Sequence, residues 1–400
     1  MNSDILVAHP GKHHVLHLVA GSIKSGANVC YITPFYRSGI GMLVSKLPGN
    51  VGEKAKGYFH PDIPHKSVCS PFQWQLKKLL SLFSNRNNYV KEFDVYVAKE
   101  IAKGKYTAKV LVTLQDYMPK TVKAAKDRGF KIWSDQILNQ SELTSLRIIS
   151  HETKQGLIPK WAHDECDNID ILNIADVITV PSNYCFDGIR NNIMDSSKVV
   201  NIPYGANPKQ FSSSRINSDG EIIILARAQS IRKGGHLLLG ALELCGNELV
   251  ERAKPLSVKV IVLGQFDTAL LNIFNKLILP NGLTVEHSNI PHSQVSSLYQ
   301  RSSLFVMPSL SEGRSLACLE AMHSGLPLII TPYCGIDGFT SGNMGYEVSD
   351  TVQSLSQALS EAFKNKHMWR EWGENAKQFA AQFDWLIYEE KISQVTRELI

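Results

Sequence analysis

Short apolar runs alternate with helix-length segments along almost the whole chain. The runs are rich in valine and isoleucine, which is typical of strands that are covered on both faces in a parallel sheet. In the first half of the chain they fall at residues 5–8, 29–32, 110–113, 131–133, 177–180 and 199–202. This alternation predicts an α/β fold of the Rossmann type.

The same pattern starts again after a turn-rich segment at residues 203–208 and a polar stretch that ends at Gly220. The new apolar runs fall at residues 222–225, 258–262, 304–307 and 328–330. Because 400 residues exceed what one hydrophobic core usually supports, we predict two Rossmann-like domains, residues 1–205 and 206–382. Ligands of such sheets bind at the carboxyl ends of the strands, which here predicts a cleft between the domains.

Composition excludes several classes of protein. Apolar residues at 44% and charged residues at 20% are ordinary globular values, which argues against a disordered chain. The net charge of +5 suits an anionic ligand or an anionic membrane surface, and it equally suits a solvated basic surface. Zinc-finger spacing, an RNA-binding aromatic signature and a long basic tract are all lacking, so no nucleic-acid partner is expected.

The sequence also favours a cytoplasmic location. Seven cysteines are scattered without a CxxC pair, as expected for reduced thiols. Residues 1–10 contain Asp4 and no cationic segment before a long apolar run, so we expect no signal peptide. No apolar run reaches the roughly 18 residues of a membrane span, so any membrane contact would be peripheral.

Residues 308–327 form the most informative segment. They follow a buried strand and open a helix that is expected to end at Gly325, since Pro327 prevents its continuation. Backbone amides around Ser315 and Leu316, at the start of this helix, would be free to bind a phosphate, helped by the helix dipole.

Two carboxylates belong to this segment. Glu320 lies among apolar neighbours, where an ionised group must be paired or hydrogen-bonded. It either accepts hydrogen bonds from ligand hydroxyls, such as those of a ribose beside the phosphate, or forms a structural pair with a basic side chain. Glu312 precedes the helix and either reaches other ligand hydroxyls or serves as a capping or solvated carboxylate.

A basic, glycine-containing loop follows the first strand of the second domain at residues 226–235. Arg227 and Lys233 are placed to neutralise a diphosphate, and the two glycines after Lys233 permit close backbone approach. Arg232 either joins them or faces solvent.

Together these residues resemble the retaining GT-B glycosyltransferases often called family 4. The spacing from Glu312 to Glu320 matches the E-x7-E motif of that family, and Arg227 with Lys233 and Gly234 matches its phosphate loop. Supporting segments are Glu-Ala-Met followed by Gly-x-Pro at residues 320–327, the strand and serine at residues 177–183, and residues 203–207. The resemblance covers most of the chain and is strongest over residues 170–335.

The resemblance implies roles for the second domain. Glu320 would bind the donor ribose, Glu312 would contact hydroxyls of the transferred sugar, and Arg227 and Lys233 would hold the diphosphate.

The start of the helix completes this implied donor site. Amides near Ser315 and Leu316 would touch the distal phosphate, with Gly313 and Arg314 in the same stretch. Many relatives have Phe-Gly in place of Arg314 and Ser315, so Arg314 is expected to contact a phosphate or an anionic sugar.

In the first domain, residues 8–14 resemble the glycine-containing loop that closes over the donor, which makes His9 and Gly11 candidate donor contacts. Three histidines in that loop suggest a metal, but the family needs none and no Asp-x-Asp motif occurs, so we expect no metal or other cofactor. Asp116 follows a central strand, where many relatives carry a histidine, and residues 133–136 are another cleft candidate.

Two further segments bear on the acceptor and on the domains. Residues 72–93 mix aromatic, leucine and basic side chains, and they either lie on an anionic membrane that carries a lipid-linked acceptor or form an ordinary surface helix. Residues 383–400 resemble the family's C-terminal helix, which packs back on the first domain.

The resemblance therefore implies a retaining, metal-independent transfer of sugar from a nucleotide diphosphate sugar to a glycan or polyprenyl-linked glycan. Surface polysaccharide assembly at the inner face of the cell membrane is the expected setting. The alternatives are a nucleotide-sugar epimerase or a phosphorylase of the same fold, and a silent partner subunit that binds nucleotide or glycan.

Overall fold

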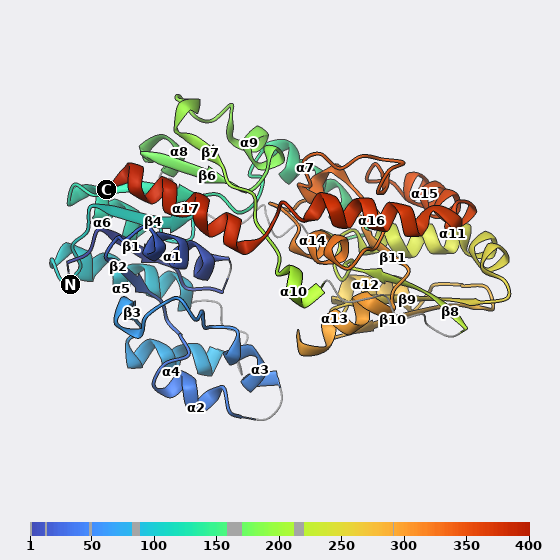
Figure 1. Cartoon of the computed structure of the whole chain (residues 1–400), viewed down its shortest axis with the longest axis horizontal. Helices are drawn as coiled ribbons and strands as arrows, with labels where there is room; N and C mark the ends of the chain where they lie inside the picture. Colours follow the sequence, from blue (N-terminus) through green and yellow to red (C-terminus); the bar gives the residue numbers. More distant parts are fainter. Residues whose placement is uncertain are drawn as a thin grey trace.

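The computed structural model describes residues 2–12, 14–47, 50–81, 89–157, 170–211, 220–290 and 292–400. Figure 1 shows two lobes, each built around a sheet with helices packed against it. The first lobe contains the N-terminal half of the chain together with the last helix, and the second contains the rest.

The first sheet has seven strands in the order β3-β2-β1-β4-β5-β6-β7, and all of its strand pairs are parallel. The strands are β1 Ile5–Ala8, β2 Val29–Ile32, β3 Val68–Cys69, β4 Val110–Leu114, β5 Lys131–Asp135, β6 Val177–Val180 and β7 Val199–Asn201. Ile5 pairs with both Val29 and Val110, so β1 lies inside the sheet, and β1 and β4 are buried along their whole length.

The second sheet has six parallel strands in the order β10-β9-β8-β11-β12-β13. The strands are β8 Glu221–Ala226, β9 Ser257–Leu263, β10 Leu283–Ser288, β11 Leu304–Met307, β12 Leu328–Ile330 and β13 Gly345–Glu347. The predicted fold class, two Rossmann-like α/β domains with parallel sheets, is confirmed.

Helices connect the strands. Their bounds are α1 Val15–Lys24, α2 Ile40–Val44, α3 Asn50–Lys56, α4 Phe72–Ser81, α5 Tyr89–Ala102, α6 Pro119–Asp127, α7 Glu142–Lys154, α8 Ile171–Ile174, α9 Asn183–Ile189, α10 Pro208–Phe211, α11 Gly235–Ala253, α12 Thr268–Phe274, α13 His292–Arg301, α14 Leu316–His323, α15 Val352–Lys364, α16 Trp369–Ala380 and α17 Trp385–Leu399. Short 3-10 turns lie at His65–Ser67, Ser196–Lys198, Pro332–Cys334 and Lys366–Met368.

Alternate residues of each central strand point into different cores. Ile5 and Val7 pack with α1 and α17, whereas Leu6 and Ala8 pack with α5, α6 and α9. In the second sheet, the even-numbered residues of β8 face α11 and α15, and the odd-numbered ones face α13, α14 and α16. Helices therefore cover both faces of each sheet, which explains why the strands are apolar without alternation.

The chain passes between the lobes twice, at neighbouring points. It leaves the first lobe at Gly205 and returns at Asp384, where Ala206 and Asp384 form an isolated parallel bridge. The Ala206 amide donates to the Phe383 carbonyl at 3.0 Å. A Cβ on Gly205 would lie 2.2 Å from the carbonyl carbon of Asp384, so only glycine permits this approach.

Helix α7 belongs to the first half of the chain but packs on the second lobe. Ile148 is buried in the core formed by β8, α11 and α15. His151 on the same helix lies 2.8 Å from His236 Nε2 and 3.2 Å from Asp350 Oδ2. The two lobes are thus joined by side-chain packing as well as by the two chain crossings, and Figure 1 shows α7 at their junction.

Candidate functional site

The basic loop follows β8, at the carboxyl edge of the second sheet. The Arg227 amide donates to the Val306 carbonyl at 3.2 Å, and its guanidinium lies 3.4 Å from the Leu263 carbonyl. Arg227 is therefore placed over the ends of three neighbouring strands, β8, β9 and β11.

Glycine is required in this loop, though for a reason other than the one expected. Gly234 has a φ of +74°, and a Cβ there would lie 1.9 Å from the Pro308 carbonyl oxygen. A Cβ on Gly235 would also lie too close to the protein, 2.3 Å from the Ala228 carbonyl oxygen. The glycines let the basic loop lie directly against the loop that follows β11.

That contact brings Glu312 to the basic side chains. The Glu312 carboxylate lies 2.5 Å from Lys233 Nζ and 3.1 Å from Arg232 Nη1, and it accepts a hydrogen bond from Ser309 Oγ at 2.7 Å. Burial alone would raise the pKa of Glu312, but the charges of Lys233 and Arg232 hold it below its usual value. Glu312 is therefore ionised, and neither its reading as a solvated carboxylate nor that of Arg232 as a solvent-facing charge is correct.

Glu320 lies on α14 in a different environment. The Tyr299 hydroxyl is 3.1 Å from its carboxylate, and no basic side chain within the described ranges forms an ion pair with it. Burial raises the pKa of Glu320 to about 6, although the more distant charge of Arg227 and the hydrogen bond from Tyr299 both oppose this shift. A structural ion pair therefore does not account for Glu320, and its carboxylate remains available to a ligand.

We expect Glu320→Gln to raise the melting temperature by about 1–3 °C at pH 7.5 and by almost nothing at pH 4. The pKa of the Glu320 carboxyl is near 4.5 in the unfolded protein and about 6 in the folded protein. The contribution of Glu320 to the stability of the fold therefore falls as the pH rises between these two values. Glutamine cannot ionise and keeps an oxygen for Tyr299. Thermal unfolding at the two pH values, with exposed Glu374→Gln as the control, tests this; an equal difference at both would contradict it.

The start of α14 differs from the expectation. Ser315 caps the helix, since its Oγ accepts from the Cys318 amide at 3.2 Å. The Ser315 amide is already used, donating to the Cys334 carbonyl at 2.9 Å, so it is not free for phosphate. The amides of Leu316 and Ala317 have no protein acceptor among the residues that the structure describes, and they remain the anion-binding groups of this helix end.

Gly313 and Arg314 serve contacts within the protein. Ser182 Oγ donates to the Gly313 carbonyl at 2.5 Å, and a Cβ on Gly313 would lie 1.9 Å from the Ile137 carbonyl oxygen. Glycine is thus needed where the second lobe touches the first.

The Arg314 side chain is fully buried, 4.0 Å from the centre of the Phe383 ring and 3.8 Å from Asp337. It donates to the Gly335 carbonyl at 3.3 Å, and burial lowers its pKa to about 10. These partners direct Arg314 toward Asp337 and toward Phe383 of the segment that returns to the first lobe, whereas the expected partner was a phosphate or an anionic sugar.

The first lobe presents its own loops to this region. His9 follows β1, is fully buried and lies edge-on to the Tyr117 ring at 5.4 Å, with half-buried Gly11 on the same loop. Asp116 is exposed after β4. Burial and Asp116 raise the pKa of Tyr117 while Arg232 of the second lobe lowers it, so Tyr117 lies within electrostatic reach of the basic loop.

Two features of the first lobe were not expected. His14 Nε2 lies 2.5 Å from Asp135 Oδ2 in a buried pair, and Thr179 donates to the other oxygen of Asp135. Gln115 has a φ of +47°, which is unusual for a residue other than glycine, and its Oε1 has no partner in the described part of the chain. Nothing in the sequence pattern signals either feature, because each depends on which loops meet.

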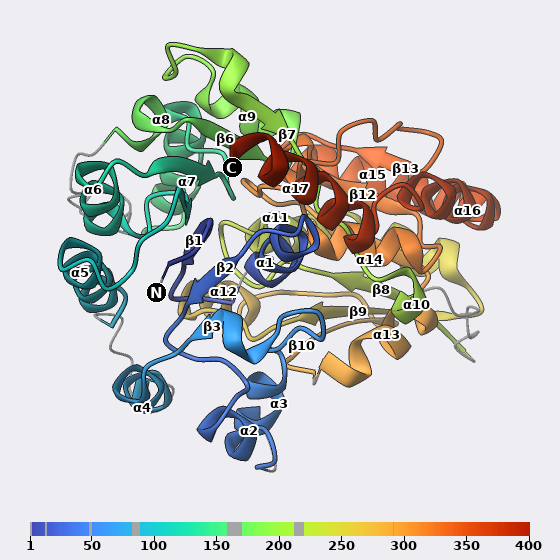
Figure 2. The same cartoon turned by 60° about the vertical axis from the view of Figure 1, so that its left-hand side comes forward.

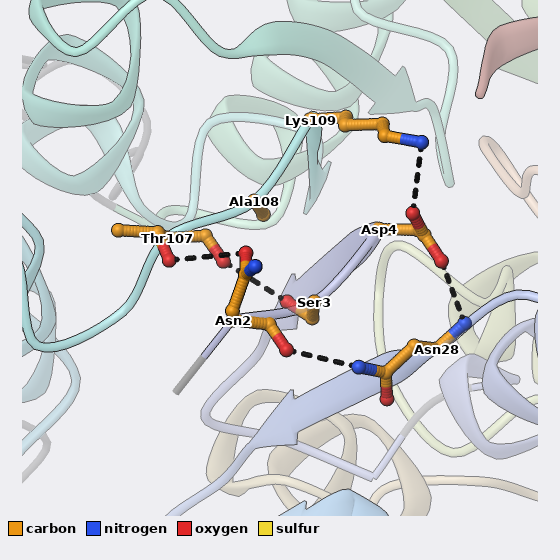
Figure 3. A pocket seen from close by; sticks show the side chains of 7 residues that line it. All are labelled: Asn2, Ser3, Asp4, Asn28, Thr107, Ala108 and Lys109. Carbon is orange, nitrogen blue, oxygen red and sulfur yellow. Dashed lines mark hydrogen bonds and ion pairs between the residues drawn. The ribbon is translucent and has the colours of Figure 1, made fainter.

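A separate pocket lies at the opposite edge of the first sheet (Figure 3). It is lined by Asn2, Ser3, Asp4, Asn28, Thr107, Ala108 and Lys109, at the amino ends of β1, β2 and β4. Asp4 pairs with Lys109 at 3.0 Å and accepts from the Asn28 amide at 3.0 Å, so the polar groups largely satisfy one another. This pocket is remote from the carboxyl ends of the strands and contributes nothing to the candidate site.

Comparison with known proteins agrees with this architecture. Residues 206–379 match the family described as Glycosyl transferases group 1. A D-inositol 3-phosphate glycosyltransferase from Gordonia bronchialis is 24% identical over 234 residues, which are 56% of this chain and 50% of that protein. The matched part of the chain spans between 13% and 56% of the length of three curated relatives, that protein among them.

Solved structures extend the similarity to the whole fold. Sucrose-phosphate synthase from Thermosynechococcus elongatus superposes with a TM-score of 0.67 at 16% identity, over 99% of this chain and 98% of that one. Anabaena HepE in complex with UDP-glucose gives 0.65 at 14% identity, over 99% and 100% of the two chains. The chain therefore has the GT-B fold, and residues 206–379 within it match the glycosyl transferases group 1 family.

Proposed function

We propose that the protein is a retaining, metal-independent glycosyltransferase that moves a sugar from a nucleotide diphosphate sugar to a glycan or lipid-linked glycan. One observation carries the proposal. Glu312 precedes helix α14, and Glu320 lies on that helix. The first carboxylate contacts Arg232 and Lys233, and the second lies within electrostatic reach of Arg227.

The arrangement suits a ligand with both negative charge and hydroxyls. Lys233 and Arg232 now pair with Glu312, and a diphosphate would compete with that carboxylate for them. Once displaced, Glu312 could accept hydrogen bonds from hydroxyls of the sugar. Glu320, supported by Tyr299, would accept those of the ribose, while the amides of Leu316 and Ala317 meet the distal phosphate.

The same groups support transfer without a protein nucleophile. As the sugar–phosphate bond breaks, negative charge grows on the phosphate, and Arg227, Lys233 and the α14 amides stabilise it. The acceptor hydroxyl attacks from the face that the phosphate leaves, and the departing phosphate takes its proton. Retention of configuration at the sugar follows, because bond formation and cleavage share one face.

A donor screen tests the proposal. HepE binds UDP-glucose, so uridine nucleotides come first in a thermal-shift screen that also includes GDP, ADP, CMP and their sugar conjugates. A ligand that binds only the folded protein raises its melting temperature. We expect a shift with one diphosphate that is lost in Glu320→Ala, followed by acceptor-dependent transfer with retained configuration.

The screen also separates the alternatives. An epimerase would convert the donor without an acceptor, and a phosphorylase would need inorganic phosphate, so products analysed with and without acceptor distinguish them. A silent subunit would bind without turnover. The complete set of Glu312, Glu320, Arg227 and Lys233 favours an enzyme, since a silent subunit has no need to keep all four groups.

For the acceptor side, we propose that α2 and α4 contact an anionic membrane. Figures 1 and 2 show α2, α3 and α4 at one end of the first lobe, and Leu79 of α4 packs on the small core that α2 and α3 share. Exposed apolar side chains on α2, on the turn that follows it and on α4 are Met42, Leu43, Leu47, Phe72, Leu76 and Leu80. Residues 82–88 of the segment lie outside the described ranges.

Helix α4 has features both of an ordinary surface helix and of a helix that lies on a membrane. Trp74 is buried in the core, as in an ordinary surface helix, whereas Phe72, Leu76 and Leu80 form an exposed apolar stripe with a spacing of four residues. Within the ranges that the structure covers, no helix is both long and apolar enough to cross a bilayer. Contact would therefore be made by one helix face and nearby lysines.

We expect Leu76→Glu/Leu80→Glu to reduce binding to vesicles containing anionic phospholipid by about tenfold or more, because two apolar contacts are replaced by like charge. Leu244→Glu, an exposed leucine on α11 in the second lobe, is the matched control. Co-sedimentation measures both. Equal binding by the two variants would contradict a role for α4.

A further inference from the structure

His17, His60 and Glu389 come together although they are far apart in the sequence. His17 lies on α1, His60 on the loop between α3 and the His65–Ser67 turn, and Glu389 on α17. One potential ligand atom from each lies within 4.8 Å of the others. The Glu389 carboxylate is 2.7 Å from His17 Nδ1 and 3.4 Å from His60 Nε2.

Contacts with neighbouring parts of the protein hold each of the three residues in place. The Tyr36 hydroxyl lies 3.2 Å from both the amide and the carbonyl of His60, fixing that residue on both sides. Gly21 of α1 lies so close to α17 that a Cβ would be 2.7 Å from the Glu389 carbonyl oxygen. The His17 ring stacks on Trp385 with 4.0 Å between centroids. Three segments are thus fixed before any ligand arrives.

The spacing suits a tetrahedral cation. Zinc bonds of about 2.1 Å to nitrogen and oxygen place neighbouring ligand atoms about 3.4 Å apart, which is the separation found between His60 and Glu389. The contact of Glu389 with His17, 2.7 Å, would open by about 0.7 Å to reach the same separation. His17 is the most exposed of the three side chains, so a water in the fourth position would lie on its side.

His60 must change its tautomer to become a ligand. Its Nδ1 now accepts weakly from the Asp62 amide at 3.3 Å, whereas coordination through Nε2 requires a proton on Nδ1. The Asp62 carboxylate lies 4.0 Å from that nitrogen and would accept the proton's hydrogen bond after moving about 1 Å closer. A carboxylate behind a ligating histidine is a usual arrangement around protein-bound zinc.

We propose that His17, His60 and Glu389 bind a structural Zn²⁺ that fastens α17 to the first lobe. The site lies five residues beyond the return crossing at Asp384. It is separate from the groups assigned to sugar transfer, so this inference does not depend on the proposed function and implies no metal in the transfer step.

The test uses the full chain freed of metal by chelator. We expect one equivalent of Zn²⁺ per chain in calorimetric titration, a higher melting temperature with zinc, and Co²⁺ absorption bands of tetrahedral strength that zinc displaces. His60→Gln and Glu389→Gln should lose all three. His65→Gln, an exposed histidine on the same segment, is the matched control and should keep them.

Absence of zinc binding in the unmodified chain, or binding that survives both ligand substitutions, would overturn the proposal. Circular dichroism shows whether the variants fold. If they do not, X-ray absorption of the zinc-loaded unmodified chain decides the matter: scattering from two imidazoles supports the site, and sulfur ligands refute it.

Discussion

Replacement of Glu312 by glutamine is expected to lower sugar transfer by roughly 10- to 150-fold while nucleoside diphosphate binding is kept or strengthened. A hydrogen bond to a charged group is worth about 1.5–3 kcal/mol, which gives this range if Glu312 holds a sugar hydroxyl in the transition state. Glu312 also occupies Lys233 and Arg232, so removing its charge releases both cations for the diphosphate. Steady-state kinetics and calorimetry measure the two effects separately.

The opposite directions of these effects make the prediction specific. A change that merely disturbed the loop would weaken both binding and transfer. Near-normal turnover would exclude Glu312 from the reaction, and weaker diphosphate binding would mean that Glu312 orients the cations rather than competing for them. Glu374→Gln, on the exposed surface of α16, controls for loss of a carboxylate in general.

Lys233→Ala is expected to reduce kcat/KM by about 10²–10³-fold and to weaken nucleoside diphosphate binding. The lysine is the nearest cation to Glu312 and stands at the start of α11, beside Gly234. Its loss removes charge stabilisation from the leaving phosphate and also leaves a buried carboxylate with Arg232 as its single cationic partner. Kinetics and calorimetry on Lys233→Ala and on exposed Lys276→Ala test this.

A double variant separates catalysis from stability. In Lys233→Ala/Glu312→Gln the unpaired carboxylate is gone, so the melting temperature should recover. Transfer should stay at or below the level of Lys233→Ala alone. Recovery of transfer together with stability would show that Lys233 serves only the fold.

Most strands were predictable because they are buried on both faces. Strands β1, β8 and β11 each contain an unbroken run of at least four apolar residues, which can be recognised without knowledge of the neighbouring strands. The three strands missed lie at sheet edges: β3 has two residues, β13 begins with glycine, and β10 alternates buried and exposed positions. Edge strands depend on pairing with a partner that the local sequence does not reveal.

The candidate site could be predicted where its side chains directly follow strands in the sequence. Glu312 and Lys233 follow strands that end at one sheet edge, and the structure brings them together. The role of the Ser315 amide was predicted wrongly, because its acceptor, the Cys334 carbonyl, comes from a later loop. The Arg314 contacts and the cluster of His17, His60 and Glu389 escaped prediction for the same reason: their partners meet only in the tertiary structure.

The paired crossings at Gly205 and Asp384 make the second lobe an insertion within the first. Residues 206–383 enter and leave at adjacent points, so this block can be exchanged for that of a relative through two joints a few ångströms apart. The hybrid would keep the loops of the first lobe, and these loops would then face the second lobe of the relative. Its success depends on α7, because Ile148 must find a matching apolar surface on the incoming block.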